Sequence, residues 1–153
     1  MPKIRIPIAV FLVSSAMLLP SQCFPDELPV VKLLAGGKEL KAEIARTPSQ
    51  RETGLMCRRV LGEGEGMLFL FEEPERAALY MKETHIPLSC AFIDSGGVIL
   101  EIRDMEPLDE TPVTSVSSRI RFALEVNRGW FKRNKIGPGM PVRTEKGDLL
   151  SLF

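Results

Sequence analysis

Hydrophobic residues recur along this chain in short runs that are typical of β-strands. The clearest alternation is IRFALEV (120–126), in which every second residue from Ile120 to Val126 is apolar, while Arg121 and Glu125 share the opposite face. MLFLF (67–71) is a continuous apolar run, short enough for a buried strand. Both segments therefore predict strands within a β-rich domain.

Turn residues separate further strand-like segments. VVKLLAGGKELKAEIA (30–45) predicts two strands around Gly36–Gly37, and DSGG (94–97) joins LSCAFID to VILEI as a hairpin. AALYMK (77–82) predicts a strand between these segments. MPVRT and LLSLF (149–153), separated by EKGD, predict a closing pair of strands.

Two segments predict helices. In TPSQRETGLMCRR (47–59), Thr47 can cap the helix, Pro48 suits its first position and Gln50 completes a capping box. NRGWFKRNK (127–135) predicts a shorter helix, stopped by Gly137, with Trp130 covering one end of the fold. The expected fold class is α+β: a β-rich compact single domain, a small barrel of short strands with two helices.

The N-terminus predicts an export signal rather than part of the fold. MPKIR carries two positive charges and precedes an uncharged apolar run of residues 6–19, which is too short to span a bilayer. We therefore expect residues 1–23 to be a signal peptide, ending in cleavage near Cys23 or in lipidation of Cys23. Residues 24–40 then form a linker and the first strand, and residues 41–153 the domain. The expected location is the bacterial periplasm or envelope, with membrane contact only through a lipid on Cys23.

Composition narrows the classes of function. Lys+Arg and Asp+Glu number 20 each, so no strong field argues for nucleic acid as a partner. Loss of Lys3 and Arg5 with the signal leaves 18 basic and 20 acidic residues. Cys57 and Cys90 could pair in an oxidising compartment, but their predicted positions, one in a helix and one in a strand, favour two thiols.

Reactive side chains form no convincing catalytic or metal site in the sequence. His85 is the only histidine, and Cys90 and Asp94 fall on one face of a strand that does not contain it, so we expect no Cys–His catalysis. Seven methionines and three cysteines could suggest soft-metal binding, but no CxxC, HxxxH or MxxM spacing is present. We expect methionine to fill the core, and no cofactor or metal.

A stripe of basic residues is the more informative feature. Arg51, Gly54 and Arg58 stand three and four residues apart, which places them along one side of the predicted helix. Two guanidinium groups beside a glycine could bind a carboxylate or phosphate in bidentate fashion. The alternatives are that these arginines pair with nearby acids or face solvent, and that Gly54 permits close packing.

Several motifs in order resemble one known family. They are RETGLMCRR (51–59), GMLFLF (66–71), YMKETHIPLSCAFID (80–94) and LEVNRGWF (124–131). Together they resemble the domain-of-unknown-function 192 family over residues 41 to about 143. The resemblance implies a compact β-rich domain, frequently exported in bacteria, and no established activity. This chain departs from the family pattern at Tyr80, which replaces a tryptophan, and at Met140, which replaces an acid.

The resemblance also selects candidate functional residues, because His85 and Cys57 fall at variable positions of the family pattern and Cys90 replaces an aliphatic residue. The matched polar positions, with Gly54 of the stripe, give the candidate ligand-binding set: Arg51, Gly54, Arg58, Lys82, Thr84, Asp94, Glu125 and Asn127.

Our leading hypothesis is a non-catalytic envelope module that binds a small anionic ligand or a protein partner. One alternative is a hydrolase or lyase acting on an envelope carbohydrate, with Asp94 and Glu125 as acid and base about 5–10 Å apart. Another is a purely structural accessory domain of an envelope assembly.

Overall fold

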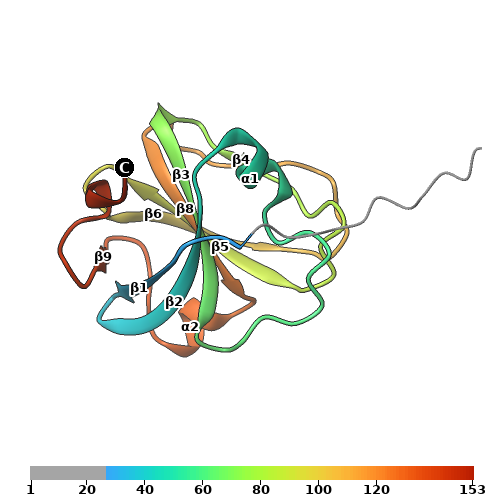
Figure 1. Cartoon of the computed structure of the whole chain (residues 1–153), viewed down its shortest axis with the longest axis horizontal. Helices are drawn as coiled ribbons and strands as arrows, with labels where there is room; N and C mark the ends of the chain where they lie inside the picture. The colour runs from blue at the N-terminus through green and yellow to red at the C-terminus, as the bar shows by residue number, and fades with distance from the viewer. Residues whose placement is uncertain (1–26) are drawn as a thin grey trace, which may run out of the picture.

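The computed structural model describes residues 27–153, which form a seven-stranded sheet flanked by short helices and loops (Figure 1). The predicted signal peptide and the Cys23 lipidation site lie outside these residues. The strands of the sheet are β1 (Val30–Ala35), β2 (Lys38–Ala45), β3 (Glu65–Glu75), β5 (Leu88–Asp94), β6 (Ile99–Met105), β8 (Ile120–Asn127) and β9 (Val142–Thr144). A second, two-stranded sheet pairs β4 (Ala78–Leu79) with β7 (Val113–Thr114). Within residues 27–153, no helix is long and apolar enough to cross a membrane.

The large sheet curls into a half-barrel. Its strand order is β6-β5-β8-β3-β2-β1-β9, so β6 and β9 are its two edges. The edges meet at one corner, where Val142 N donates to Gly97 O (2.7 Å) and Ile99 N to Met140 O (3.0 Å). The predicted α+β domain, rich in β-strands, is confirmed; the barrel is closed only at this corner.

Local sequence explains the tight connections. Gly36 and Gly37 both adopt positive φ between β1 and β2, a backbone conformation that glycine tolerates. At the β5–β6 turn, Asp94 Oδ1 accepts hydrogen bonds from Gly96 N and Val98 N, both at 2.9 Å. These contacts confirm both predicted turns.

Apolar side chains pack on both faces of the curled sheet. The first core includes Leu33, Leu68, Leu70, Phe122, Leu124 and Trp130, all buried. The second core includes Met67, Phe69, Met81, Cys90, Phe92 and Ala123, all buried. Because side chains alternate along a strand, neighbouring residues of β3 and β8 enter different cores.

The helices and the C-terminus differ from the expectation in extent. Helix α1 spans only Pro48–Thr53, although the predicted capping box on Thr47 is present. The chain leaves the helix at Gly54, whose φ of 48° is left-handed and ends the helical hydrogen-bond ladder. Helix α2 is a single turn, Trp130–Arg133, and it buries Trp130 as expected.

The predicted last strand is wrong. LLSL forms a 3-10 helix, η1 (Leu149–Leu152). A tight turn between Thr144 and Gly147 ends β9 and redirects the chain. Leu149 then packs into the first core, so burial of this side chain, rather than strand pairing, determines the local structure. AALYMK is also mostly irregular, since β4 covers only Ala78–Leu79.

Candidate functional site

A small cavity lies over the second core, where α1 and the segment that contains β4 cover the sheet (Figure 1). Its volume is about 50 Å³, enough for a few water-sized groups. Thirteen residues line it: Arg51, Glu52, Thr53, Gly54, Leu55, Met56, Phe69, Ala78, Leu79, Tyr80, Met81, Thr84 and Glu125. Four of these are sequence candidates: Arg51, Gly54, Thr84 and Glu125.

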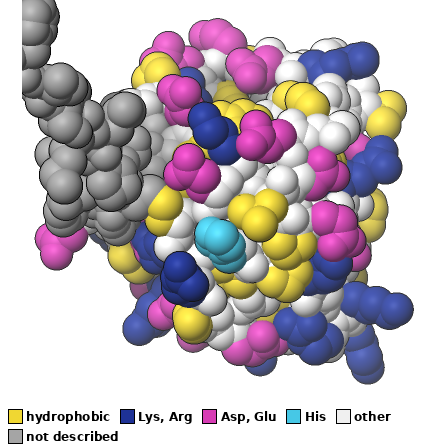
Figure 2. All heavy atoms as spheres, turned by 90° about the vertical axis from the view of Figure 1, so that its right-hand side faces the viewer, with side chains coloured by type: hydrophobic (Ala, Val, Ile, Leu, Met, Phe, Trp, Pro, Cys, Tyr) yellow, Lys and Arg dark blue, Asp and Glu magenta, His cyan; other side chains and the backbone are white. Residues whose placement is uncertain are grey.

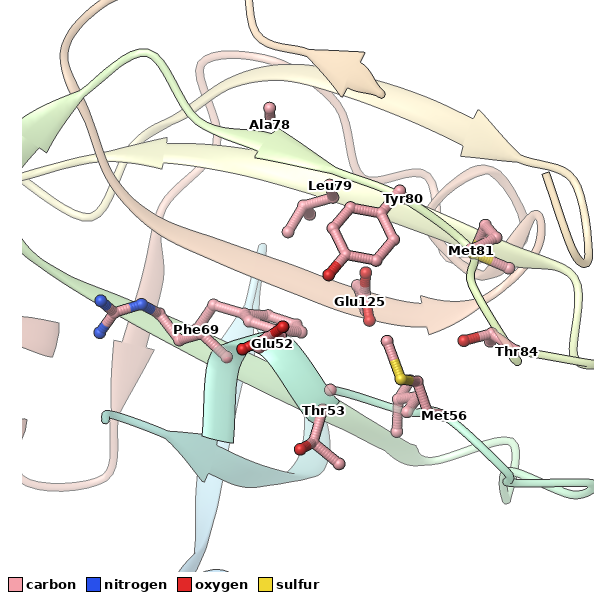
Figure 3. A pocket seen from close by; sticks show the side chains of 13 residues that line it. Glu52, Thr53, Met56, Phe69, Ala78, Leu79, Tyr80, Met81, Thr84 and Glu125 are labelled. Carbon is pink, nitrogen blue, oxygen red and sulfur yellow. The ribbon is translucent and has the colours of Figure 1, made fainter. Parts of the chain in front are cut away.

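Glu125 is the central polar group of this cavity. Figure 3 shows its carboxyl between the side chains of Tyr80 and Met56. The residue comes from β8 and is flanked in register by Met67 of β3 and Cys90 of β5. Its exposed fraction is only 4%, and none of the described residues gives its carboxyl a hydrogen bond or an ion pair. The protein therefore holds an unpartnered carboxyl against the cavity.

Burial controls the charge of this carboxyl. Loss of hydration disfavours the ionised form and raises the pKa of Glu125 to about 8. At neutral pH the side chain is then largely protonated and can donate as well as accept a hydrogen bond. A buried carboxyl without a protein partner is costly unless a ligand or water satisfies it. Perturbed groups of this kind mark candidate functional sites.

The walls around Glu125 are mostly apolar or electron-rich. Phe69 and Tyr80 supply aromatic rings, and Met56 supplies a thioether. Thr84, which is buried, uses its hydroxyl hydrogen to donate to Lys82 O at 3.1 Å, so its oxygen is left as an acceptor. Tyr80 is 38% exposed and stands at the opening. The lining thus combines a carboxyl and hydrogen-bond acceptors with aromatic and sulfur surface.

Arg51 lines the cavity but its guanidinium serves the fold. Its Nη1 donates to Leu70 O at 3.0 Å and to Arg46 O, and its guanidinium carbon lies 5.7 Å from the centre of the Phe71 ring. None of these three partners lines the cavity. Arg51 therefore fastens α1 to β3.

Gly54 allows α1 to approach the sheet closely. A Cβ at this position would stand 3.3 Å from Cζ of Phe69, tighter than an ordinary van der Waals contact. The packing expected for Gly54 is therefore present at the edge of the cavity, and its left-handed φ adds a second reason for glycine.

Arg58 does not form a helical stripe with Arg51, which corrects the sequence interpretation. The helix ends at Thr53, and Arg58 lies beyond it. Its Nη2 pairs with Glu43 Oε2 at 2.5 Å. This ion pair agrees with the alternative stated for the sequence, that the arginine pairs with a nearby acid instead of binding a ligand. Arg58 does not line the cavity.

Three further candidates lie elsewhere. Lys82 is exposed and outside the cavity lining, and Asp94 organises the β5–β6 turn. Asn127 Nδ2 donates to Leu61 O (2.8 Å) and Gly62 O (3.1 Å), so it ties a loop to the end of β8. Asp94 and Asn127 thus have structural roles.

The register separates Asp94 from Glu125. Glu125 stands opposite Cys90, whereas Asp94 stands opposite Ile120. Five residues of β8 correspond to roughly 17 Å, well beyond the separation of glycosidase carboxyls. The acid–base pair of the carbohydrate hydrolase is therefore not formed.

The cysteines and the histidine do not form a reactive centre. Cys90 is a free, buried thiol whose pKa is raised well above its ordinary value, first by burial and then by Glu125 and Glu101. Cys57 is disulfide-bonded, so the expectation of two free thiols is wrong, and these two cysteines are not paired with each other. His85 is exposed and is the cyan side chain on a face of mixed hydrophobic, acidic and basic groups in Figure 2. Residues 27–153 contain no cluster of three metal-ligating His, Cys, Asp or Glu side chains.

Comparison with known proteins identifies the family. The DUF192 model, described as "Uncharacterized ACR", matches residues 31–144. The chain belongs to the DUF192 family. The resemblance predicted from the ordered motifs is thereby confirmed. No curated protein matches the chain.

Two solved structures resemble this DUF192 domain closely. One, from Sinorhizobium meliloti 1021 and described as a "putative transcription regulator", is 37% identical, with a TM-score of 0.70, 75% of this chain covered and 92% of that one. The other, a protein of unknown function from Novosphingobium aromaticivorans DSM 12444, is 33% identical, with a TM-score of 0.74, 77% of this chain covered and 87% of that one. Both support the fold, and neither description names a ligand.

Proposed function

We propose that this DUF192 protein is an exported, non-catalytic module that binds a small ligand, or one end of a larger one, in the cavity at Glu125. The observation that carries the proposal is the Glu125 carboxyl, which is 96% buried, faces a cavity and has no partner among the described residues. A ligand group that satisfies this carboxyl would offset the cost of its burial.

The arrangement favours binding over catalysis. The other two charged lining residues, Arg51 and Glu52, come from α1; Arg51 is engaged with Arg46 and Leu70, and Glu52 is exposed. No second carboxyl stands within the buried part of the lining to form an acid–base pair with Glu125. The arginines also give less support to an anionic ligand than their spacing suggested, because Arg58 pairs with Glu43.

Export remains part of the proposal. The two basic residues of MPKIR and the apolar run of residues 6–19 that follows them support it. The intact mass of protein recovered from the bacterial envelope tests this part. A mass that retains residues 1–23 would contradict export by a cleaved signal.

Methionine methyl groups provide the test for binding. Met56 and Met81 line the cavity, whereas Met140 lies away from it beside Gly36. In a protein labelled with 13C at the methionine methyls, we expect fragments from an amine, carboxylate and sugar library to shift Met56 and Met81 but not Met140. Thr53→Trp, at an exposed position of the cavity rim, should abolish the shifts without unfolding the protein. The proposal fails when no fragment produces a cavity-specific shift.

A further inference from the structure

The cavity chemistry indicates what kind of group it receives. We propose that it binds a primary ammonium group, with the Glu125 carboxylate as counter-ion. This inference rests on the proposed binding function and names the ligand class. Such a group can come from a small free amine or from the end of a lysine side chain.

The Glu125 carboxyl and the Thr84 hydroxyl oxygen are two acceptors of the lining that none of the described residues supplies with a donor. Glu125 has no internal donor, and the Thr84 hydroxyl hydrogen is already used for Lys82 O. An ammonium group brings three N–H donors and no acceptor, so it can satisfy both oxygens of the carboxyl and the hydroxyl oxygen of Thr84. A ligand carboxylate would instead place a second acceptor and a like charge against Glu125.

The apolar part of the wall also suits a cation. Phe69 and Tyr80 line the cavity with aromatic rings, whose faces attract an ammonium group. Met56 and Met81 add polarisable thioether surface that can contact the methylene next to the nitrogen. The guanidinium of Arg51, the one cation in the lining, is held toward Arg46, Leu70 and Phe71.

The size of the cavity limits the ligand. A volume of about 50 Å³ accommodates an ammonium group with a short stem, rather than a whole sugar or nucleotide. The exposed position of Tyr80 leaves room for a longer chain to continue into solvent. Both sources of the ammonium group therefore remain compatible with the shape.

Binding must be linked to proton release. Burial raises the pKa of Glu125 to about 8, so a cation that pairs with its ionised form expels a proton at neutral pH. Cys90 on β5 stands opposite Glu125, and the other ionisable residues of the lining are Tyr80, Arg51 and Glu52; Met67 and Phe69 of β3 carry no charge. Cys90 stays protonated in this range, because burial raises its pKa further. Apparent affinity should rise about tenfold per pH unit between pH 6 and 7.

Calorimetry of the full-length mature protein tests the inference. Methylamine and Nα-acetyl-lysine amide serve as the two ammonium probes, titrated at pH 6, 7 and 8 in two buffers of different ionisation enthalpy. We expect close to one proton released per ligand bound at pH 6 and 7. Binding of methylamine assigns a small amine as a sufficient ligand, whereas binding of the lysine derivative alone assigns a lysine end.

Matched probes and variants sharpen the result. Tetramethylammonium, which has the charge but no N–H, should bind at least tenfold more weakly. Glu125→Gln should lose amine binding at least tenfold, whereas Glu72→Gln, which removes an exposed carboxylate of β3 outside the cavity lining, should bind within about twofold of the wild type. Thermal unfolding checks that Glu125→Gln is folded, and the proton count on the wild type does not depend on that variant.

Two results would overturn the inference and separate it from the proposed function. Carboxylate or neutral fragments that shift Met56 and Met81 while both amines do not would refute the ammonium class and leave small-ligand binding intact. Equal binding of methylamine and tetramethylammonium, or amine binding without proton release, would also refute it. Absence of any cavity-specific shift would remove both proposals.

Discussion

Leu124 and Glu125 are adjacent on β8, both are buried, and they face different cores. Leu124 enters the first core, whose members among the described residues are all apolar and include Trp130. Glu125 enters the region of the second core, where α1 and the β4 segment leave a cavity of about 50 Å³. The first core thus holds the half-barrel together, while the second combines packing with an unsatisfied polar group. A protein that keeps such a group at a cost in stability is expected to use it.

Removing the packing at Leu124 should have the largest effect on stability. Leu124→Ala deletes a side chain with no exposed surface and leaves a void in the first core, so we expect a loss of about 2–5 kcal/mol in the free energy of unfolding. Urea denaturation followed by tryptophan fluorescence measures it, because Trp130 lies in the same core. Ligand-induced shifts at Met56 should persist in the folded fraction. A loss below about 1 kcal/mol would contradict the view that this core supports the fold.

Replacing Glu125 should stabilise the protein at neutral and alkaline pH, whereas Leu124→Ala destabilises it. The pKa of Glu125 is about 8 in the folded protein and near 4.5 ordinarily, so the folded state binds the extra proton between these values. Wild-type stability should therefore fall as pH rises from 4.5 to 8, with an upper limit of about 5 kcal/mol at about 1.36 kcal/mol for each pH unit. Below pH 4.5 both states are protonated and the effect is absent.

Glu125→Gln removes this dependence. At pH 8 the variant should be more stable than the wild type by about 2 kcal/mol or more, with little difference at pH 4.5. Urea denaturation at pH 4.5, 6, 7 and 8 gives the comparison, and Glu52→Gln is the control, since Glu52 is exposed. Parallel pH profiles for wild type and Glu125→Gln would show that the carboxyl is not held in a desolvated environment.

Asn127 should have a smaller effect that belongs to the fold alone. Asn127→Ala removes two hydrogen bonds to the carbonyls of Leu61 and Gly62, so we expect a loss of about 1–2 kcal/mol. Asn127→Asp keeps the size but cannot donate, and should lose a similar amount. Because Asn127 does not line the cavity, amine affinity should stay within about twofold. If an Asn127 variant kept normal stability but bound amines much more weakly, Asn127 would have to be part of the binding site.

Much of the fold follows from the sequence, because its signals are local. Alternation in 120–126 defines β8, and the turn residues at Gly36–Gly37 and DSGG define two hairpins. The predicted final strand failed because burial of Leu149 outweighs the β-propensity of LLSLF. The length of α1 was overestimated because the left-handed Gly54 ends the helix early.

The site was harder to predict, because it depends on contacts between distant segments. The sequence selected Glu125 and Thr84, and the alternation placed Glu125 with Arg121 on the face of 120–126 opposite the apolar residues, but it did not indicate that Glu125 is buried. The continuous apolar run MLFLF indicated that its own strand, β3, is buried on both faces. Because β3 pairs with β8, this run was the one signal in the sequence that Glu125 would be buried too. The roles of Tyr80 and Met56 in the lining depend on how the β4 segment and α1 fold over the sheet, which no local pattern specifies.

The smallest effect is expected at Arg58, and it separates surface electrostatics from the binding site. The Arg58–Glu43 pair is partly buried, with side-chain exposures of 26% and 21%, so a double-mutant cycle with Arg58→Gln and Glu43→Gln should give a coupling of about 1 kcal/mol or less. Amine affinity should not change in either variant, because neither residue lines the cavity. If Arg58→Gln weakened ligand binding as strongly as Glu125→Gln, the site would have to extend from the second core to β2, and the arginine hypothesis from the sequence would regain support. An unchanged affinity assigns ligand recognition to the buried carboxyl alone.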